Sequence, residues 1–348
     1  MLLQQRSAFV ASTCTIKNPS LMRFLTIICS LSFVLFGCNT GQEAPDRATS
    51  NATPVQTAAF TFADQDPGLS DYWYQGKAEI SRYDLEQNRY QDVHPGEAVA
   101  IFVTEDFLTD KQVKNDNYNN PNSTPVLKTN LLRKFPTGIY DYSIMTSVFT
   151  PTKVKEHPQT LKVSTTAQDW CGHAYMQLNY EEEQYRMQLH SYFENEADQD
   201  EKVGYAMLED ELFNRIRIHP EGLPTGQMDV IPATTVIRLR HLPFKAYTAN
   251  ATHGDYSGTD FEGSNLKVYT LEYPELQRTL SIVYQAESPY IIEGWKDTYP
   301  SAFDRQPRTT LARRTNTILS PYWKLNGLED LPKRQQLEME VFSGKAVD

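Results

Sequence analysis

The sequence predicts a mainly β protein: a large curved antiparallel sheet or half-barrel with one amphipathic helix at about residues 207–218. From Phe60 onward, short stretches rich in Val, Ile, Thr, Tyr and Phe are separated by Pro, Gly, Asn and Asp, a pattern typical of strands and turns. In Tyr185–Phe193, apolar and polar side chains alternate, which indicates a strand with one solvated face. Apolar residues make up 40% of the 348, enough for a sizeable core.

The predicted strands are bounded by turn residues: Glu97–Phe107, Gly138–Phe149, Thr160–Thr166, Ala174–Tyr180, Tyr185–Phe193, Thr234–Arg240, Leu266–Tyr273, Arg278–Gln285 and Tyr290–Trp295. An unbroken apolar run inside Glu97–Phe107 predicts a central strand that is covered on both faces. Long loops are expected at Asn115–Pro125 and Glu194–Lys202, where polar residues cluster.

Met207–Ile218 departs from the strand period and places Leu208, Leu212 and Ile216 at helical spacing. Its acids, Glu209, Asp210 and Glu211, come early and its arginines late, as the helix dipole favours. These acids are therefore interpreted as a first helical turn rather than as paired catalytic carboxylates. A continuing strand is the competing interpretation.

Residues 1–37 predict a secretory signal peptide. Arg23 is followed by an apolar run, Phe24–Phe36, which is shorter than the roughly 20 residues that a membrane-spanning helix needs. Leu35-Phe36-Gly37-Cys38 resembles the bacterial lipobox, although Phe36 is larger than usual. The resemblance implies cleavage before Cys38 and lipidation of that cysteine. An ordinary N-terminal anchor is the alternative. Because Met22 precedes Arg23, residues 1–21 could also be a misassigned start.

The expected layout is a lipidated flexible tether over residues 38–59, an antiparallel β domain over 60–332, and a polar tail over 333–348. Residues 39–58 hold almost no large apolar side chain, which predicts the tether. Asn39 follows the cysteine where enteric inner-membrane lipoproteins carry Asp, so the analogy favours the outer membrane. Periplasmic and surface faces both remain open.

The charge balance argues against nucleic acid as a partner. Residues 1–37 hold three of the 33 basic side chains and none of the 44 acidic ones, so the rest of the chain carries a net charge of −14. Phosphate backbones and anionic membrane surfaces should repel such a body. The membrane is therefore expected as a partner through the lipid anchor.

Asp169-Trp170-Cys171-Gly172-His173 is the most suggestive motif for chemistry. On a strand, Asp169, Cys171 and His173 would share one face, and these are the components of an activated nucleophile. We expect instead that Cys171 is a buried packing residue, with Trp170 packed on the opposite face. A metal site that adds His190 or His157 is a weaker alternative. No cofactor is predicted, because no phosphate loop, G-x-S-x-G or H-E-x-x-H motif occurs.

Several phrases resemble a lipoprotein family of unknown function from Gram-negative bacteria, mainly the Bacteroidetes group: Pro95-Gly96-Glu97, Ile101–Phe107, Met145–Pro151 and Trp170-Cys171-Gly172-His173. Members are sometimes labelled septum formation inhibitor Maf, but the S-x-S-P-R-R-like loop of Maf pyrophosphatases does not occur here. The order of helix, Leu223–Gly226 turn and antiparallel strands also resembles periplasmic domains that fold as a curved sheet around a helix, a shape shared with lipoprotein carriers.

Two function classes follow. The first is a non-enzymatic envelope protein that binds a lipid, a glycan or a protein, or that has a structural role. Its 20 Tyr and four Trp could line a lipid or glycan cleft, although Tyr is also common in strands that have one face in solvent. The second is an envelope hydrolase or transferase using Cys171 and His173. A large apolar cavity without a Cys–His contact would favour the first class.

Overall fold

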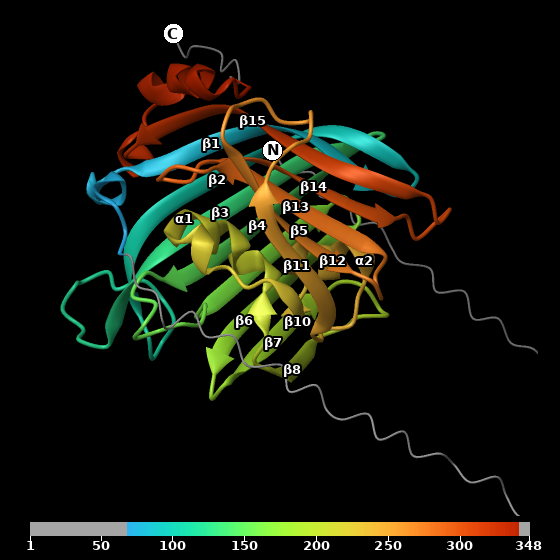
Figure 1. The fold of residues 1–348 in the computed structure, drawn as a ribbon, viewed down its shortest axis with the longest axis horizontal. Coiled ribbons are helices and arrows are strands. Elements are labelled where there is room, and N and C mark those ends of the chain that lie inside the picture. Colours follow the sequence, from blue (N-terminus) through green and yellow to red (C-terminus); the bar gives the residue numbers. More distant parts are fainter. Residues whose placement is uncertain (1–67, 341–348) are drawn as a thin grey trace, which may run out of the picture. The chain divides into compact units, whose positions relative to one another are not determined.

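Strands that hydrogen-bond into one 15-stranded sheet dominate residues 68–340, which are the residues that the computed structural model describes (Figure 1). The first half of the sheet is a meander: β1 (Ala78–Arg89), β2 (Asp92–Leu108), β3 (Ser123–Thr137), β4 (Tyr140–Pro151), β5 (Lys162–Asp169), β6 (Gly172–Glu181), β7 (Gln184–Ser191) and β8 (Gln199–Gly204). The second half is β9 (Met207–Leu208), β10 (Gly226–Ile231), β11 (Tyr247–Asp255), β12 (Leu266–Tyr273), β13 (Arg278–Gln285), β14 (Ile292–Pro300) and β15 (Pro307–Ser320).

The two halves join where β15 pairs with β1, with Ile318 opposite Ile80. All neighbouring strands are antiparallel except β9 and β10, which run parallel. The prediction of a mainly β protein with a large curved sheet is confirmed. The signal peptide, Cys38 and the tether lie outside the described residues.

The two edge strands, β8 and β9, are separated in the chain only by Tyr205 and Ala206. Gly204, at the end of β8, and Met207, at the start of β9, are three peptide units apart, which span at most about 11 Å. These ends of the two edge strands therefore lie close together. No hydrogen-bonded ladder between β8 and β9 belongs to the described sheet, which therefore curls round without closing.

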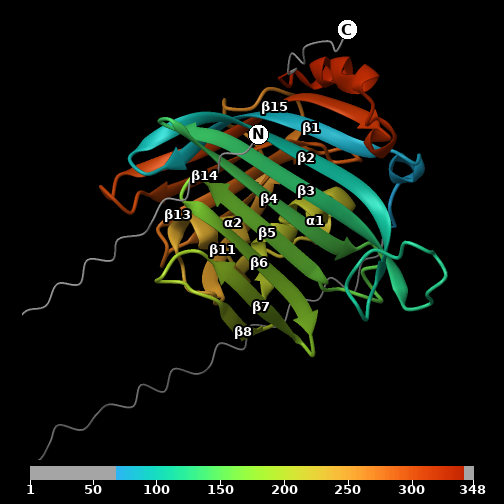
Figure 2. The ribbon, with the colours of Figure 1, turned by 180° about the vertical axis from the view of Figure 1, so that it is seen from behind.

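Two short helices, α1 (Leu212–Ile218) and α2 (Thr234–Arg240), lie on the concave face of the sheet (Figures 1 and 2). Leu212 and Ile216 of α1 are fully buried among inner-face side chains from both halves of the sheet. The described 3-10 helices are η2 (Asp71–Tyr74), η3 (Glu209–Glu211), η4 (Pro220–Gly222), η5 (Tyr322–Lys324) and η6 (Leu328–Leu337). No helix within residues 68–340 is long and apolar enough to cross a membrane.

The predicted strand Thr234–Arg240 is wrong, because this segment is α2. Every residue from Thr234 to Leu239 is buried, so the helix has no polar face and its apolar run shows no helical period. The Asp210 carboxylate accepts a 2.8 Å hydrogen bond from the Thr234 N–H and thereby caps the helix. Burial on all sides thus overrides the strand propensity of its β-branched residues.

The helix predicted at Met207–Ile218 is shorter than expected. It starts with strand β9 and the 3-10 turn η3, and only Leu212–Ile218 is α-helical. Two predicted loops are also shortened by strands, since β3 begins at Ser123 and β8 at Gln199.

The described part of the predicted polar tail is mostly exposed, but it begins as the end of η6 and contains one buried residue. Leu337 at the end of η6 is buried against Ile80 and Val99 on the outer face of the sheet. This cover explains why β2 carries an apolar run on both faces, as the sequence predicted: Ala98 and Phe102 face the core, and Val99 faces η6.

Candidate functional site

A cavity of about 650 Å³ lies on the inner face of the sheet, where β6, β7 and α2 meet the connection between β7 and β8. Its apolar wall consists of thioether, aliphatic and aromatic side chains: Met176, Met187, Leu189, Ile237 and Phe244. Its polar wall comes from the β7–β8 connection, β8 and the end of α2: Asn195, Glu196, Gln199, Glu201, Arg238 and His241. One side of the cavity is therefore apolar and the other offers charges and hydrogen bonds.

The alternation of side chains along β6 and β7 produces the apolar wall, because every second residue faces the inner side of the sheet. Met176 on β6 lies directly opposite Leu189 on β7, and Met187 lies two residues earlier on β7. All three side chains are buried on the inner face, as the sequence predicted for Met187 and Leu189. Ile237 from α2 packs in the same cluster, so the helix forms the opposite side of the cavity.

Glu196 holds the polar wall together. Its Oε1 lies 2.5 Å from Arg238 Nη1 and 2.5 Å from His241 Nδ1, and its Oε2 accepts a hydrogen bond from Ser191 Oγ. In the tautomer that carries a proton on Nδ1, His241 donates a hydrogen bond to this carboxylate. Burial lowers the pKa of Arg238, and the charge of Glu196 opposes this effect. Glu196, Arg238 and His241 thus form a connected cluster of polar side chains beside the cavity.

A smaller cavity of about 70 Å³ adjoins this cluster and shares Arg238 and His241 with the larger one. Arg89, at the end of β1, donates to the carbonyl of Leu239 at the last turn of α2 and to the Tyr142 hydroxyl. Its guanidinium has no carboxylate partner among the described residues. The smaller cavity therefore presents a second cation next to the helix C-terminus, where a cation is favoured.

The charges around the two cavities nearly cancel. Arg89 and Arg238 are opposed by three carboxylates, Asp169, Glu196 and Glu201. His241 adds a positive charge only when its ring is protonated. This balance favours a neutral or zwitterionic polar group over a strongly charged one.

The motif at residues 169–173 forms the tip of a hairpin and not a continuous strand. β5 ends at Asp169 and β6 begins at Gly172. The Asp169 carboxylate accepts hydrogen bonds from the N–H groups of Cys171, at 2.7 Å, and Gly172, at 3.3 Å, as Asp does in turns. Asp169, Cys171 and His173 therefore do not share the strand face that their spacing suggested.

The expectation that Cys171 is a buried packing residue is wrong, because the cysteine is exposed. Trp170 is also exposed and does not pack on the opposite face. Within residues 68–340, the structure gives no contact between Cys171 and His173. Cys171 instead lines the 70 Å³ cavity together with His241.

The structure does not bring the proposed metal ligands together. Within the described part of the chain, no three His, Cys, Asp or Glu side chains are placed to hold a metal ion. His190 instead lies 3.3 Å from Asp198.

The acids at 209–211 bind partners inside the sheet. Glu209 pairs with Arg278 and accepts a hydrogen bond from the Tyr273 hydroxyl, and Glu211 pairs with Arg215. These contacts, together with the cap that Asp210 provides, give all three acids structural roles.

Sequence reasoning missed Glu196, Arg238 and His241. The only local signal was Arg238 inside the apolar run Val236-Ile237-Arg238-Leu239, because a charge in such a run needs a partner when it is buried. The local sequence places Glu196 in a loop, and nothing in its neighbours identifies Arg238 as its partner.

No protein-family model, curated protein or solved structure matches this chain. The site's own geometry is therefore the basis for a functional proposal.

Proposed function

We propose that this protein is a non-enzymatic lipoprotein of the cell envelope that binds an amphipathic ligand in the inner-face cavity. The observation that carries the proposal is the 650 Å³ cavity with one apolar wall and one ion-paired wall. Its volume falls within the roughly 300–1,000 Å³ of small-molecule sites.

The two walls define the ligand. Phe193 and Leu242, which are only partly buried, offer apolar contacts to an acyl chain or a ring, and Met176, Met187 and Ile237 back them from the core. Arg238 and Glu196 offer donors and acceptors in nearly balanced charge, which suit hydroxyl groups or a zwitterion. A lipid with a sugar-like or zwitterionic head combines both properties.

Anchoring through acylated Cys38, in the outer membrane, completes the proposed role. Its support is the lipobox-like Leu35–Cys38 and the absence of Asp at position 39. A tether of about 20 residues spans roughly 25 Å as a flexible coil, enough to hold a binding domain away from the lipid surface.

The proposal is tested by mass spectrometry of lipids and glycans that copurify with the protein from its native envelope. Gln199→Trp, on the edge strand β8, places a large ring at the cavity and should remove the copurifying ligand. Lys202→Trp lies on the same strand outside the cavity lining and is the matched control. A ligand that is retained equally by both variants would contradict binding in this cavity.

A second candidate function, a thiol hydrolase or transferase, keeps one specific observation in its favour. Exposed Cys171 shares a cavity with His241, whose Nδ1 is held by Glu196, as a carboxylate holds the base in a catalytic triad. The pairing differs from the Cys171–His173 pair expected from sequence.

Native labelling with iodoacetamide separates the two candidates. An activated thiol should react faster than free cysteine at neutral pH, and His241→Ala should slow that reaction. A rate equal to that of free cysteine, unchanged in His241→Ala, would leave Cys171 as an ordinary exposed thiol.

A further inference from the structure

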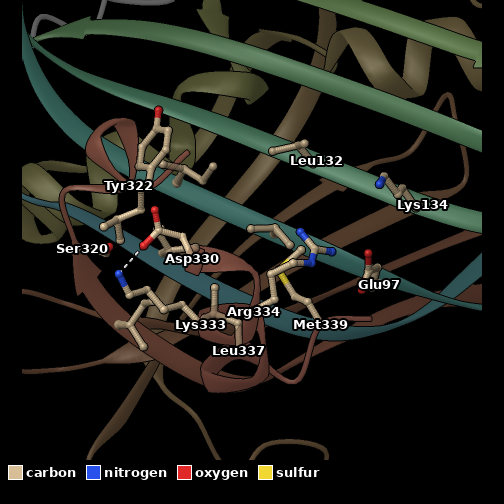
Figure 3. A pocket seen from close by; sticks show the side chains of 15 residues that line it. Glu97, Leu132, Lys134, Ser320, Tyr322, Asp330, Lys333, Arg334, Leu337 and Met339 are labelled. Carbon is tan, nitrogen blue, oxygen red and sulfur yellow. Dashed lines mark hydrogen bonds and ion pairs between the residues drawn. The ribbon is translucent and has the colours of Figure 1, made fainter. Parts of the chain in front are cut away.

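A groove of about 280 Å³ lies on the outer face of the sheet, beneath the C-terminal segment (Figure 3). Leu132 and Lys134 on β3 form the strand side, and Leu337 and Met339 face them from η6 and the turn after it. This groove is on the opposite face of the sheet from the inner cavity, so it is a separate site.

The floor of the groove is a continuous apolar row across the strands. Ile101, Ile80 and Ile318 lie directly opposite one another on β2, β1 and β15, and Val99 lies opposite Leu132 on β3. These side chains point away from the core, where an uncovered sheet face would carry polar residues. The groove therefore runs across four adjacent strands.

The dimensions of the groove suit one small, extended ligand. Three spacings between neighbouring strands make it about 14 Å long. Its volume of about 280 Å³ lies at the lower end of the roughly 300–1,000 Å³ of small-molecule sites, which suits one acyl chain better than two.

The charged rim of the groove includes Lys134 on β3. Lys333 pairs with Asp330, and Glu97 lies 3.8 Å from Arg82. Within residues 68–340, Lys134 has no hydrogen bond or ion pair, although it lines the groove. An anionic head group can therefore reach a lysine that is not engaged elsewhere.

We propose that this groove binds one long-chain fatty acid, with its acyl chain between the outer-face isoleucines and the C-terminal segment and its carboxylate at Lys134. The small volume favours a fatty acid over a diacyl lipid, and the unpaired lysine complements a carboxylate.

The test is calorimetric titration of the full chain carrying Cys38→Ser with octanoate, decanoate and dodecanoate. Each methylene that is buried should tighten binding by about fourfold. Ile101→Trp fills the groove from its floor and should weaken dodecanoate binding by more than about tenfold. Val93→Trp, on the same strand and outside the groove lining, should bind like the parent. Leu132→Trp, which fills the groove from β3, is the second groove-filling variant and replaces Ile101→Trp if that variant does not fold.

The head group is tested separately. Lys134→Glu should weaken dodecanoate binding and leave dodecanol binding unchanged. Retained dodecanoate affinity in both groove-filling variants would overturn the proposal, as would loss of binding in His241→Ala, which belongs to the inner cavity. Binding that appears only after residues 341–348 are removed would also overturn it, because the chain's own end would then be the occupant.

Discussion

Arg278 shows how ion pairs compensate the burial of charged side chains inside the curved sheet. Its Nε lies 2.6 Å from Asp297 Oδ1 and its Nη1 lies 2.5 Å from Glu209 Oε2, and the side chain is almost fully buried. The planar guanidinium can serve two carboxylates at once, which an ammonium cannot do with the same geometry. Arg278 therefore links η3 to β13 and β14 inside the protein.

Arg278→Gln should destabilise the protein by about 3–5 kcal/mol, because it leaves two buried carboxylates without a counter-charge. Urea unfolding followed by circular dichroism measures this change. Arg186→Gln is the control, since Arg186 forms a comparable pair with Asp200 in solvent and should change the midpoint little. Equal midpoint shifts in the two variants would contradict the importance of the buried cluster.

Asp210 should make stability depend on pH. Burial raises the pKa of Asp210 to about 7, against the lowering effect of the Thr234 N–H and with the added effect of Glu209. In the unfolded chain an Asp ionises near pH 3.9. Between about pH 4 and 7 the folded protein therefore holds a proton that the unfolded chain has lost, and raising the pH favours unfolding.

Asp210→Asn keeps an oxygen for the Thr234 N–H but cannot ionise. Its melting temperature should fall less than that of the parent as the pH rises from 4 to 7. Asp200→Asn, in an exposed pair, is the control. Parallel profiles for the parent and Asp210→Asn would show that this carboxyl does not titrate in the window.

At the scale of elements, η6 acts as a cover for the outer face. It has little apolar periodicity and contains Pro332, yet Leu337 packs on Ile80 and Val99. The local sequence indicates a polar tail because most of this segment is indeed solvated. Leu337, with Tyr322 and Met339 packed in the same cluster, docks the segment on the apolar row.

Leu337→Ala should cost about 2 kcal/mol or more, since it removes a buried side chain and leaves a cavity. Leu328→Ala, in the same helix but 83% exposed, should change stability by less than about 0.5 kcal/mol. Thermal unfolding compares the two variants. If both behave alike, η6 does not dock on the sheet in solution, and the polar tail expected from sequence would be the better description.

At the scale of the whole molecule, one sheet joins two meanders through strands far apart in the chain. β1 and β15 pair over residues 78–86 and 311–320, with the Arg313–Glu86 ion pair across the join. The chain enters this sheet at β1, after the segment that should carry the anchor. The expected attachment to a membrane therefore rests on sequence patterns before the described part of the chain.

Cys38→Ser should move the protein from the membrane fraction to the soluble fraction. Two or three acyl chains anchor a protein stably where one does not, so loss of the acylated cysteine removes the anchor. Fractionation followed by immunoblotting measures the change, and Cys171→Ser is a control that keeps the lipobox. A Cys38→Ser protein that still sediments at the parent level would place the anchor elsewhere.

Features that depend on neighbouring residues can be predicted from the amino-acid sequence. Alternation in Tyr185–Phe193 predicted β7, and the apolar run of β2 predicted a strand with two covered faces. The sequence also provides the expectation of export and lipidation at Cys38, because targeting signals are local. Local patterns sufficed for these features because strand period and turn chemistry act over a few residues.

Contacts between distant segments follow from the three-dimensional packing of the sheet. This packing made Thr234–Arg240 a helix, since a segment buried on all sides loses the pattern that marks a helix. It brought Glu196 to Arg238 and His241, 42 and 45 residues apart in the chain, and exposed Cys171 on a hairpin beside them. Such contacts depend on how distant strands pair and curl, and no local period records that geometry.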